Sequence, residues 1–294
     1  MKIGYPCINN SIGCTSNKTF RLANYSENLL KQKIKENIGC LQKTLEYNVK
    51  NNLLFFRIGS GLIPFASHEV CKFNWQKEFK KEFQEIGNFI KKHNMRISMH
   101  PDQFVLINSP NKEIVERSFA ELRYHCEVLD LMELDGTAKV QIHVGGVYGE
   151  KENAIQRFVE NYGRLPVKIK KRLCIENDER LYCLQDCLKI NKKMGIPIIF
   201  DFFHHSLFNQ KESFQEALKK VKKTWKNKDG IPMTDYSSQK EEGRFGAHTE
   251  SIDLKDFEKT LKEIKDSGVD IDIMLEIKDK EKSALKVLSI LDKK

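Results

Sequence analysis

Short apolar segments alternate with longer amphipathic segments along almost the whole chain of 294 residues. The short segments are rich in β-branched and aromatic residues, as buried strands are, whereas the longer ones carry apolar residues at helical spacing, as residues 75–93 do. Alternation of this kind predicts βαβ units with parallel strands. The expected strands are residues 2–6, 53–59, 96–100, 139–144, 173–177, 197–201, 230–237 and 272–277.

Eight such units in a chain of this length fit an α/β fold of one kind, a closed (β/α)8 barrel or TIM barrel, better than an open doubly wound sheet. No Pro-, Ser- or Gly-rich tract and no short repeat interrupts the sequence, so we expect residues 1–294 to form a single domain. In a TIM barrel the functional side chains lie at the carboxyl ends of the strands. The ends of the expected strands therefore decide what chemistry the chain can perform.

Six consecutive expected strands carry side chains of metal-binding type at or near their carboxyl ends. Residues 198–205 read IIFDFFHH, in which a buried strand ends in Asp201 and His204 follows three residues later. A buried carboxylate is costly unless a positive charge accompanies it. The whole set along the chain is His100, His143, Glu176, Asp201 with His204, Asp235 and Glu276.

Each of these residues has a simpler interpretation when it is taken alone. Asp201 could cap a helix beside solvated histidines, and a single histidine on a strand is more often a core residue than a ligand. Six coordinated placements at one rim favour a metal site instead. Imidazoles mixed with carboxylates suit Zn²⁺, Mn²⁺ or Fe²⁺ more than Ca²⁺, and so many ligands imply two or three ions with Glu176 as a bridge. His248, in the loop 243–250, would complete a further site with His204.

The eight cysteines are spread over the chain, without a Cys-x-x-Cys pair and without a preceding signal peptide. We therefore expect eight reduced thiols in a cytoplasmic protein. Cys183 and Cys187 lie four residues apart, but a zinc site there would need a second cysteine pair. No segment approaches the roughly 18 consecutive apolar residues of a membrane span.

The charge balance is moderately basic, with 50 Lys and Arg against 41 Asp and Glu and a formal net charge of +9. Such an excess is consistent with a polyanionic partner such as nucleic acid. It is equally typical of solvated lysine-rich helices, of which residues 219–228 are an example.

Seven segments that extend over nearly the whole chain form distinct motifs. They are IGYPCIN (3–9), FRIGSGLIPFASHE (56–69), SMHPDQFVLINSP (98–110), IHVGG (142–146), LCIENDE (173–179), DFFHH (201–205) and DYSSQ (235–239). In these motifs the chain resembles the UV damage endonuclease family and, more distantly, the endonuclease IV group of metal-dependent TIM-barrel nucleases. Segments 56–69 and 98–110 are long enough to make the resemblance specific.

The resemblance implies an enzyme that nicks DNA immediately 5′ of UV photoproducts, both cyclobutane dimers and 6-4 photoproducts, and leaves 3′-hydroxyl and 5′-phosphate ends. It implies two or three divalent ions, Mn²⁺ first, with Mg²⁺, Co²⁺ or Zn²⁺ as alternatives. The partner would be damaged double-stranded DNA, bound by a monomer at the nucleoid. Carried over by motif, the metal ligands are His100, His143, Glu176, Asp201, His204, Asp235, His248 and Glu276.

Three of these ligands would also take part in catalysis. Glu176 would bridge ions, and Asp201 and Glu276 would orient the attacking water. The sequence contains no evident Ser/His/Asp or Cys/His nucleophile arrangement, so we expect water to attack the phosphodiester directly, without a covalent intermediate.

Three further residues would meet the DNA if the resemblance holds. Gln103 and Phe104 would probe the damaged duplex as an intercalating wedge, and Tyr5 would lie near the displaced lesion. For Phe104, which Val105 and Leu106 follow, a place in the hydrophobic core is an equally good interpretation.

The chain departs from the family's pattern in two ways. The family's seventh strand has a lysine, which can be carboxylated, two positions before a histidine ligand, and here these positions are Met233 and Asp235. We therefore expect a different charge distribution around the middle metal. Phe104 stands where some relatives have Tyr, which keeps a stacking face and loses a hydroxyl.

Two other classes of protein compete with the nuclease. A metal-dependent sugar isomerase or epimerase shares the barrel and part of the ligand set, although the motifs and the basic charge count against it. A non-catalytic DNA-binding module leaves the convergence of so many ligands unexplained.

Overall fold

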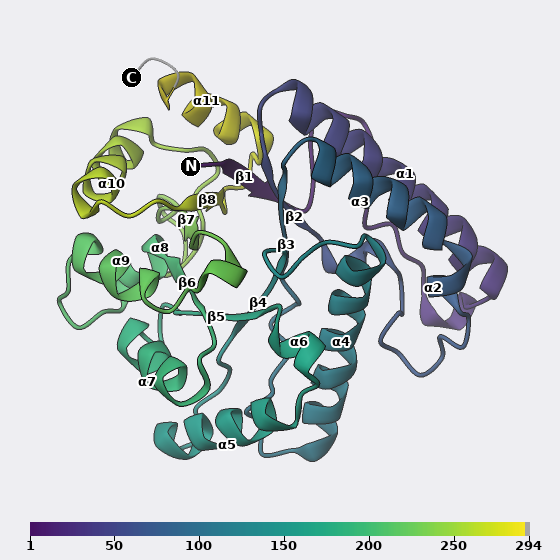
Figure 1. Cartoon of the computed structure of the whole chain (residues 1–294), viewed down its shortest axis with the longest axis horizontal. Coiled ribbons are helices and arrows are strands. Elements are labelled where there is room, and N and C mark those ends of the chain that lie inside the picture. The colour runs from purple at the N-terminus through teal and green to yellow at the C-terminus, as the bar shows by residue number, and fades with distance from the viewer. Residues whose placement is uncertain (292–294) are drawn as a thin grey trace.

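The computed structural model describes residues 1–291, in which eight strands close into one parallel barrel (Figure 1). Each strand pairs with its neighbours in sequence, and β1 pairs with β8 to close the barrel, with Ile3 opposite Ile273. The predicted TIM barrel is confirmed, and the strand bounds differ from the expected ones by at most three residues at either end. The strands are β1 Ile3–Pro6, β2 Phe55–Ile58, β3 Arg96–Met99, β4 Lys139–His143, β5 Leu173–Glu176, β6 Ile198–Asp201, β7 Met233–Tyr236 and β8 Asp272–Leu275.

Helices surround the barrel and cover its outer face (Figure 1). Most begin at a polar cap, as α1 does at Ser26 and α9 does at Ser213, where Glu216 completes a capping box. The helices are α1 Glu27–Lys50, α2 Trp75–Glu78, α3 Lys80–Lys92, α4 Lys112–Leu131, α5 Lys151–Arg164, α6 Val167–Lys170, α7 Leu184–Met194, α8 Phe202–Leu207, α9 Phe214–Lys222, α10 Leu254–Ser267 and α11 Glu281–Leu291. In the part of the chain that the structure describes, none of these helices has the length and apolar character that a membrane crossing needs.

Two glycines permit close packing within this architecture. A Cβ atom on Gly4 would lie 2.2 Å from the carbonyl oxygen of Phe55, so β1 and β2 can pair only if this position has no side chain. A Cβ atom on Gly87 would lie 1.8 Å from the carbonyl oxygen of Met132, where α3 meets the residue after α4. Both contacts require glycine for steric reasons.

The helix expected at residues 75–93 is divided into α2 and α3. Phe79 leaves the helical conformation, with φ −106° and ψ 18°, and ends one helix where the next begins. Its side chain is buried, and the rings of Trp75 and Phe83 pack on each other at a centroid distance of 6.0 Å. The apolar spacing predicted the buried face correctly but not the turn at Phe79, because burial of that face continues through the turn.

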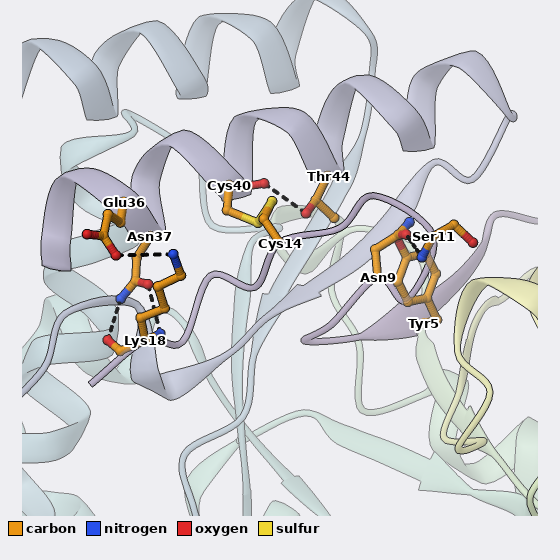
Figure 2. The surroundings of a disulfide bond; sticks show 9 residues. All are labelled: Tyr5, Asn9, Ser11, Cys14, Lys18, Glu36, Asn37, Cys40 and Thr44. Atoms are coloured by element: carbon orange, nitrogen blue, oxygen red, sulfur yellow. Dashed lines mark hydrogen bonds and ion pairs between the residues drawn. A yellow bond between two sulfur atoms is a disulfide. The ribbon is translucent and has the colours of Figure 1, made fainter. Parts of the chain in front are cut away.

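The expectation that all eight cysteines are reduced is wrong for one pair. Cys14 and Cys40 form a disulfide between the loop after β1 and helix α1, with their Cα atoms 6.0 Å apart (Figure 2). Asn37, one turn earlier in α1, holds the same loop, because its side chain accepts from the Lys18 backbone N–H at 2.8 Å and donates to the Lys18 carbonyl at 3.0 Å. The two cysteines are 26 residues apart, so only the folded loop brings them together. The remaining six are free thiols.

Candidate active site

Five of the predicted ligands converge at the carboxyl ends of β3 to β6. His100 directly follows β3, and His143, Glu176 and Asp201 are the last residues of β4, β5 and β6. His204 lies in α8, which begins immediately after β6 because Asp201 caps it. The Oδ1 atom of Asp201 accepts a hydrogen bond from the His204 backbone N–H at 2.8 Å. The helix cap therefore places His204 next to Asp201.

Glu176 lies at the centre of this convergence. Its Oε2 atom is 3.4 Å from Nε2 of His100 and 3.7 Å from Nε2 of His143, and its Oε1 atom is 3.3 Å from Nδ1 of His204. The side chains form two groups, His100 with His143 and Glu176, and Glu176 with Asp201 and His204. In each group the potential ligand atoms lie within 4.8 Å of one another. Glu176 belongs to both groups, as a carboxylate between two ions would.

The residues of these groups fit divalent metal ions. Within residues 1–291, the buried Oδ2 of Asp201 and the buried Nδ1 of His143 have no hydrogen-bond partner. A buried polar atom without a partner costs about 1–3 kcal/mol, and a coordinated cation removes that cost for a carboxylate oxygen such as Oδ2. Imidazole nitrogens together with carboxylate oxygens form the donor set that Mn²⁺, Zn²⁺ and related ions accept.

The electrostatics of the five residues indicate a need for positive charge. Burial raises the pKa of Asp201 well above its usual value, although His204 opposes this shift. Burial would also raise the pKa of Glu176, but His143, His100 and His204 bring it well below its usual value. Burial alone would lower the pKa of His204, yet Asp201 and Glu176 raise it to about 11. Without a bound cation, a proton on His204 supplies the positive charge beside these carboxylates.

The ring of His100 is held in an orientation that suits a ligand. Its Nδ1 lies 2.8 Å from the Pro101 carbonyl oxygen, which can only accept, so Nδ1 carries a proton and Nε2, on the side of Glu176, is the nitrogen that would bind an ion. Behind it, the hydroxyl of Ser60 donates to the His100 carbonyl at 3.0 Å and contacts Nε2 of the buried His125 at 3.0 Å. The chain His125–Ser60–His100 fixes the backbone that carries the ligand.

Asp235 and Glu276 lie outside the two groups, on either side of an arginine that the sequence analysis missed. Arg57 of β2 is buried and points into the barrel, with Nη2 2.7 Å from Oδ1 of Asp235 and Nη1 against Oε1 of Glu276. Gln141 joins this arrangement to the first group. Its Oε1 accepts from Arg57 at 2.8 Å, and its amide nitrogen donates to both Glu176 and Asp235.

The two carboxylates beside Arg57 respond differently to it. Burial raises the pKa of Asp235 to about 7, although Arg57 opposes this shift. Burial would also raise the pKa of Glu276, but Arg57, helped by His248 and His100, lowers it to about 2. Glu276 is the more exposed of the two, so it keeps its negative charge near the mouth of the barrel.

The loop histidine His248 reaches the same rim. Its Nδ1 lies 2.7 Å from the Glu276 carbonyl oxygen and 3.7 Å from the Glu276 carboxylate, and its ring lies 6.1 Å from that of His204. The predicted proximity of His248 to His204 is therefore present, with Glu276 as the third neighbour. Neither His248 nor Glu276 belongs to the two groups around Glu176.

A cavity of about 840 Å³ opens above these residues, with His100, His143, Glu276 and Arg57 in its lining. Gln103 and Phe104 stand at its edge, and 75% of the Phe104 surface is exposed. This exposure excludes the alternative in which Phe104 is a core residue. Phe104 therefore presents its ring to solvent at the edge of a polar cavity.

Tyr5 does not lie where the sequence analysis expected it. Its side chain is fully buried between β1 and α1, where its hydroxyl donates to Asn48 at 2.6 Å. The same hydroxyl accepts from Asn9 at 2.7 Å (Figure 2). Residues alternate between the two faces of a strand, and Tyr5 occupies the face that packs on the helices. A place for Tyr5 beside a displaced base is therefore wrong for this structure.

The sequence did contain a signal for Arg57 and Gln141. Gln141 is two residues before His143 on the same strand, so both side chains lie on one face. Arg57 interrupts the otherwise apolar segment LLFFRIG, where a buried guanidinium must find a carboxylate. Period-two alternation applied to each strand would have assigned both residues to the barrel interior.

The fold and this rim define the chain as a TIM-barrel protein with a polar site at the carboxyl ends of its strands, the usual position of the active site in such enzymes. Residues 1–293 match the family described as UV-endonuclease UvdE. The chain belongs to this family and is an enzyme, as the sequence analysis predicted.

Curated relatives and solved structures agree with this assignment. A UV DNA damage endonuclease of Clostridium perfringens is 42% identical over 99% of this chain and 71% of its own length. Another, from Bacillus thuringiensis subsp. konkukian, is 36% identical over 87% of this chain and 81% of its own length. The crystal structure of SacUVDE superposes with a TM-score of 0.95 at 44% identity, covering 100% of this chain and 98% of that one.

More distant structures share the fold alone. Endonuclease IV from Thermus thermophilus has a TM-score of 0.56 at 13% identity, over 86% of this chain and 94% of that one. A D-psicose 3-epimerase from Clostridium cellulolyticum has a TM-score of 0.54 at 11% identity, over 81% of this chain and 79% of that one. The rival assignment to the sugar isomerases and epimerases thus rests on the barrel only, and the family match decides against it.

Proposed function

We propose that this chain, acting as a single domain of residues 1–294, is a divalent-metal-dependent repair endonuclease that nicks DNA immediately 5′ of UV photoproducts. The products would be a 3′-hydroxyl and a 5′-phosphate. The observation that carries the proposal is that Glu176 belongs to both groups of ligand side chains, of which His100 and His143 line a cavity that Gln103 and Phe104 border. Damaged double-stranded DNA is the substrate, and the protein acts as a monomer at the nucleoid in the cytoplasm.

The metal ions would be held by the two groups around Glu176. His100 and His143 would share one ion with Glu176, and Asp201 and His204 would share another with it. We assign Mn²⁺ first, with Mg²⁺, Co²⁺ and Zn²⁺ as alternatives, because the donors are both nitrogen and oxygen. Bound divalent ions neutralise the phosphate oxygens, lower the pKa of water and stabilise the leaving oxygen.

The side chains of the site perform the remaining tasks. Asp201 and Glu276 accept hydrogen bonds from the attacking water and orient it, and Glu276 keeps its negative charge because Arg57 lies beside it. Arg244, Lys278 and Lys280 line the same cavity and attract the phosphate backbone. Basic side chains at the cavity therefore explain substrate attraction better than the net charge of the whole chain does.

Recognition of damage would depend on the cost of unstacking. A crosslinked dipyrimidine stacks and pairs poorly, so extruding it costs less than extruding an undamaged step. Gln103 and Phe104 are exposed at the edge of the cavity and would fill the gap left in the duplex. Phe104 offers a stacking face, and Gln103 offers both a donor and an acceptor to the opposite bases.

The test uses a labelled duplex with one cyclobutane dimer at a defined position and a matched undamaged duplex. With Mn²⁺ we expect one cut immediately 5′ of the dimer, and a 3′ end that a DNA polymerase extends without further processing. A cut elsewhere, a 3′-phosphate, or equal cleavage of the undamaged duplex would reject the proposal.

A further inference from the structure

We propose that the guanidinium of Arg57 takes the place of one metal ion, so that this site binds two divalent ions and excludes a third. The inference rests on the metal-dependent function proposed above and specifies its ion count. Eight ligand-type side chains at the rim have enough donors for two or three ions. The contacts that each carboxylate already makes decide between two ions and three.

Two of the carboxylates at the rim, Asp235 and Glu276, are already bound to Arg57. Asp235 is buried, with Oδ1 held by Arg57 at 2.7 Å and Oδ2 held by the amide of Gln141. Glu276 receives the other guanidinium nitrogen of Arg57. An arginine presents its donors in a rigid planar fork, and here the fork spans two carboxylates from β7 and β8. A metal ion that shared these carboxylates would have to displace Arg57.

Asp201 and Glu176 differ from Asp235 and Glu276 in their neighbours. Asp201 is just as buried as Asp235, yet within the described residues its Oδ2 has no hydrogen-bond partner, and Nδ1 of His204 lies 3.6 Å from it. Glu176, the residue between the two ligand groups, contacts three histidines and no arginine or lysine. The groups around Glu176 therefore retain free coordination positions, whereas both oxygens of Asp235 and Oε1 of Glu276 are already hydrogen-bonded.

Charge balance points in the same direction. The four carboxylates of the rim, Glu176, Asp201, Asp235 and Glu276, carry four formal negative charges, and Arg57, paired with two of them, reduces the sum to three. Two divalent ions exceed that charge by one, and a bound phosphodiester brings the sum to zero. A third divalent ion would lie beside Arg57, which stays charged at every working pH, and cations repel strongly in a buried site.

The seventh strand contributes no further ligand. Met233 is two residues before Asp235 and is almost fully buried, and its side chain has no oxygen or nitrogen to offer an ion. Strand β7 thus supplies one carboxylate, already bound to Arg57, where a metal site would need additional donors. Arg57 and Met233 together therefore favour a site for two ions.

The experiment measures Mn²⁺ bound per chain by equilibrium dialysis and elemental analysis of the chelator-treated full-length protein. We expect two ions in the wild type, three in Arg57→Met, which removes the charge but keeps an unbranched side chain, and two in Arg57→Lys. Arg172→Met is the matched control, because Arg172 is an equally buried arginine paired with Asp130 away from the rim. It should leave the count at two if the variant folds.

Three ions in a wild type that still nicks irradiated DNA would overturn this inference and leave the proposed function intact. A count that stays at two in folded Arg57→Met would also overturn it. A wild type that binds no Mn²⁺ and does not nick would overturn both the proposed function and the inference. If Arg57→Met does not fold, the wild-type count, together with an unchanged count of two in Arg57→Lys, decides the question.

Discussion

The two ends of the barrel both bury charged side chains, but they balance them differently. At the amino end, Lys139 pairs with Asp229 at 2.6 Å and Arg96 lies 3.6 Å from Asp272, with the Trp225 ring 5.8 Å from both cations. Each buried carboxylate there has its own cation. At the carboxyl end, Arg57 pairs with Asp235 and Glu276, whereas Glu176 and Asp201 have histidines as their charged neighbours.

This difference separates stability from function. A balanced buried pair satisfies itself, and removing one partner leaves an uncompensated charge. An unbalanced cluster destabilises the folded chain until a cation binds, so its cost is recovered only when the site is loaded. Substitutions at the two ends should therefore affect different properties.

The largest effect is expected from Lys139→Met, which breaks the balance at the amino end. Asp229 would remain buried without its cation, which costs about 3–5 kcal/mol of unfolding free energy. Urea denaturation measures this loss, and Mn²⁺ binding should not change. Adding Asp229→Asn should restore part of the stability, and a double variant no more stable than Lys139→Met would contradict the pairing.

Glu176→Gln removes a negative charge at the carboxyl end of the barrel, whereas Lys139→Met removes a positive charge at the amino end. A neutral amide is a poor bridge between cations, so we expect nicking to fall by about 100- to 1,000-fold and Mn²⁺ binding to weaken. The metal-free protein should lose some thermal stability, because the three histidines that lower the pKa of Glu176 lose their negative partner. Near-normal nicking in saturating Mn²⁺ would exclude Glu176 from the metal site.

His125 is a buried titratable group outside both charged clusters. Its closest opposite charge among the described residues is the carboxylate of Glu121, 3.6 Å away. Burial lowers its pKa from 6.5 to about 4, so the unfolded chain binds a proton more readily than the folded one between these values. Its contribution to stability is complete above pH 6.5 and is lost as the pH falls toward 4.

We therefore expect the metal-free wild type to lose about 2 kcal/mol more than His125→Gln when the pH is lowered from 7.5 to 5. Glutamine can still hydrogen-bond Ser60 but cannot titrate. Urea denaturation at both pH values measures the difference. Equal losses in the two proteins would show that His125 is not the acid-sensitive group.

The smallest effect is expected at the edge of the cavity. Gln103→Ala combined with Phe104→Ala should weaken binding to UV-damaged duplex about 10-fold, because a stacking face is lost, while the Mn²⁺ count stays unchanged. Val167→Ala is the control, since Val167 is also exposed and lies on α6, before β5. A reduced metal count in the double variant would mean that these residues support the barrel instead.

Much of the fold and part of the site follow from the sequence alone. Alternating apolar segments fix the strand order of a barrel, and that order places His100, His143, Glu176, Asp201 and His204 at one rim. Local sequence was sufficient here because the carboxyl ends of parallel strands always meet.

Other features depend on which face of a strand a residue occupies. Every residue of β1 is buried, so its hydrophobicity does not distinguish the barrel interior from the helix-facing side, and Tyr5 was assigned to the wrong one. The contacts of Arg57 with Asp235 and Glu276 join residues about 180 and 220 positions apart and appear only when the barrel closes. The Cys14–Cys40 disulfide depends on a loop path that no local pattern encodes.

As proposed above, the excess of negative charge at the carboxyl end of the barrel gives this chain a metal-dependent nuclease activity on UV-damaged DNA. Its most direct test is relaxation of supercoiled plasmid, irradiated or untreated, by chelator-treated protein with and without added Mn²⁺. We predict relaxation only of the irradiated plasmid and only with Mn²⁺. Relaxation without a divalent ion, or equal relaxation of both plasmids, would contradict the proposed function.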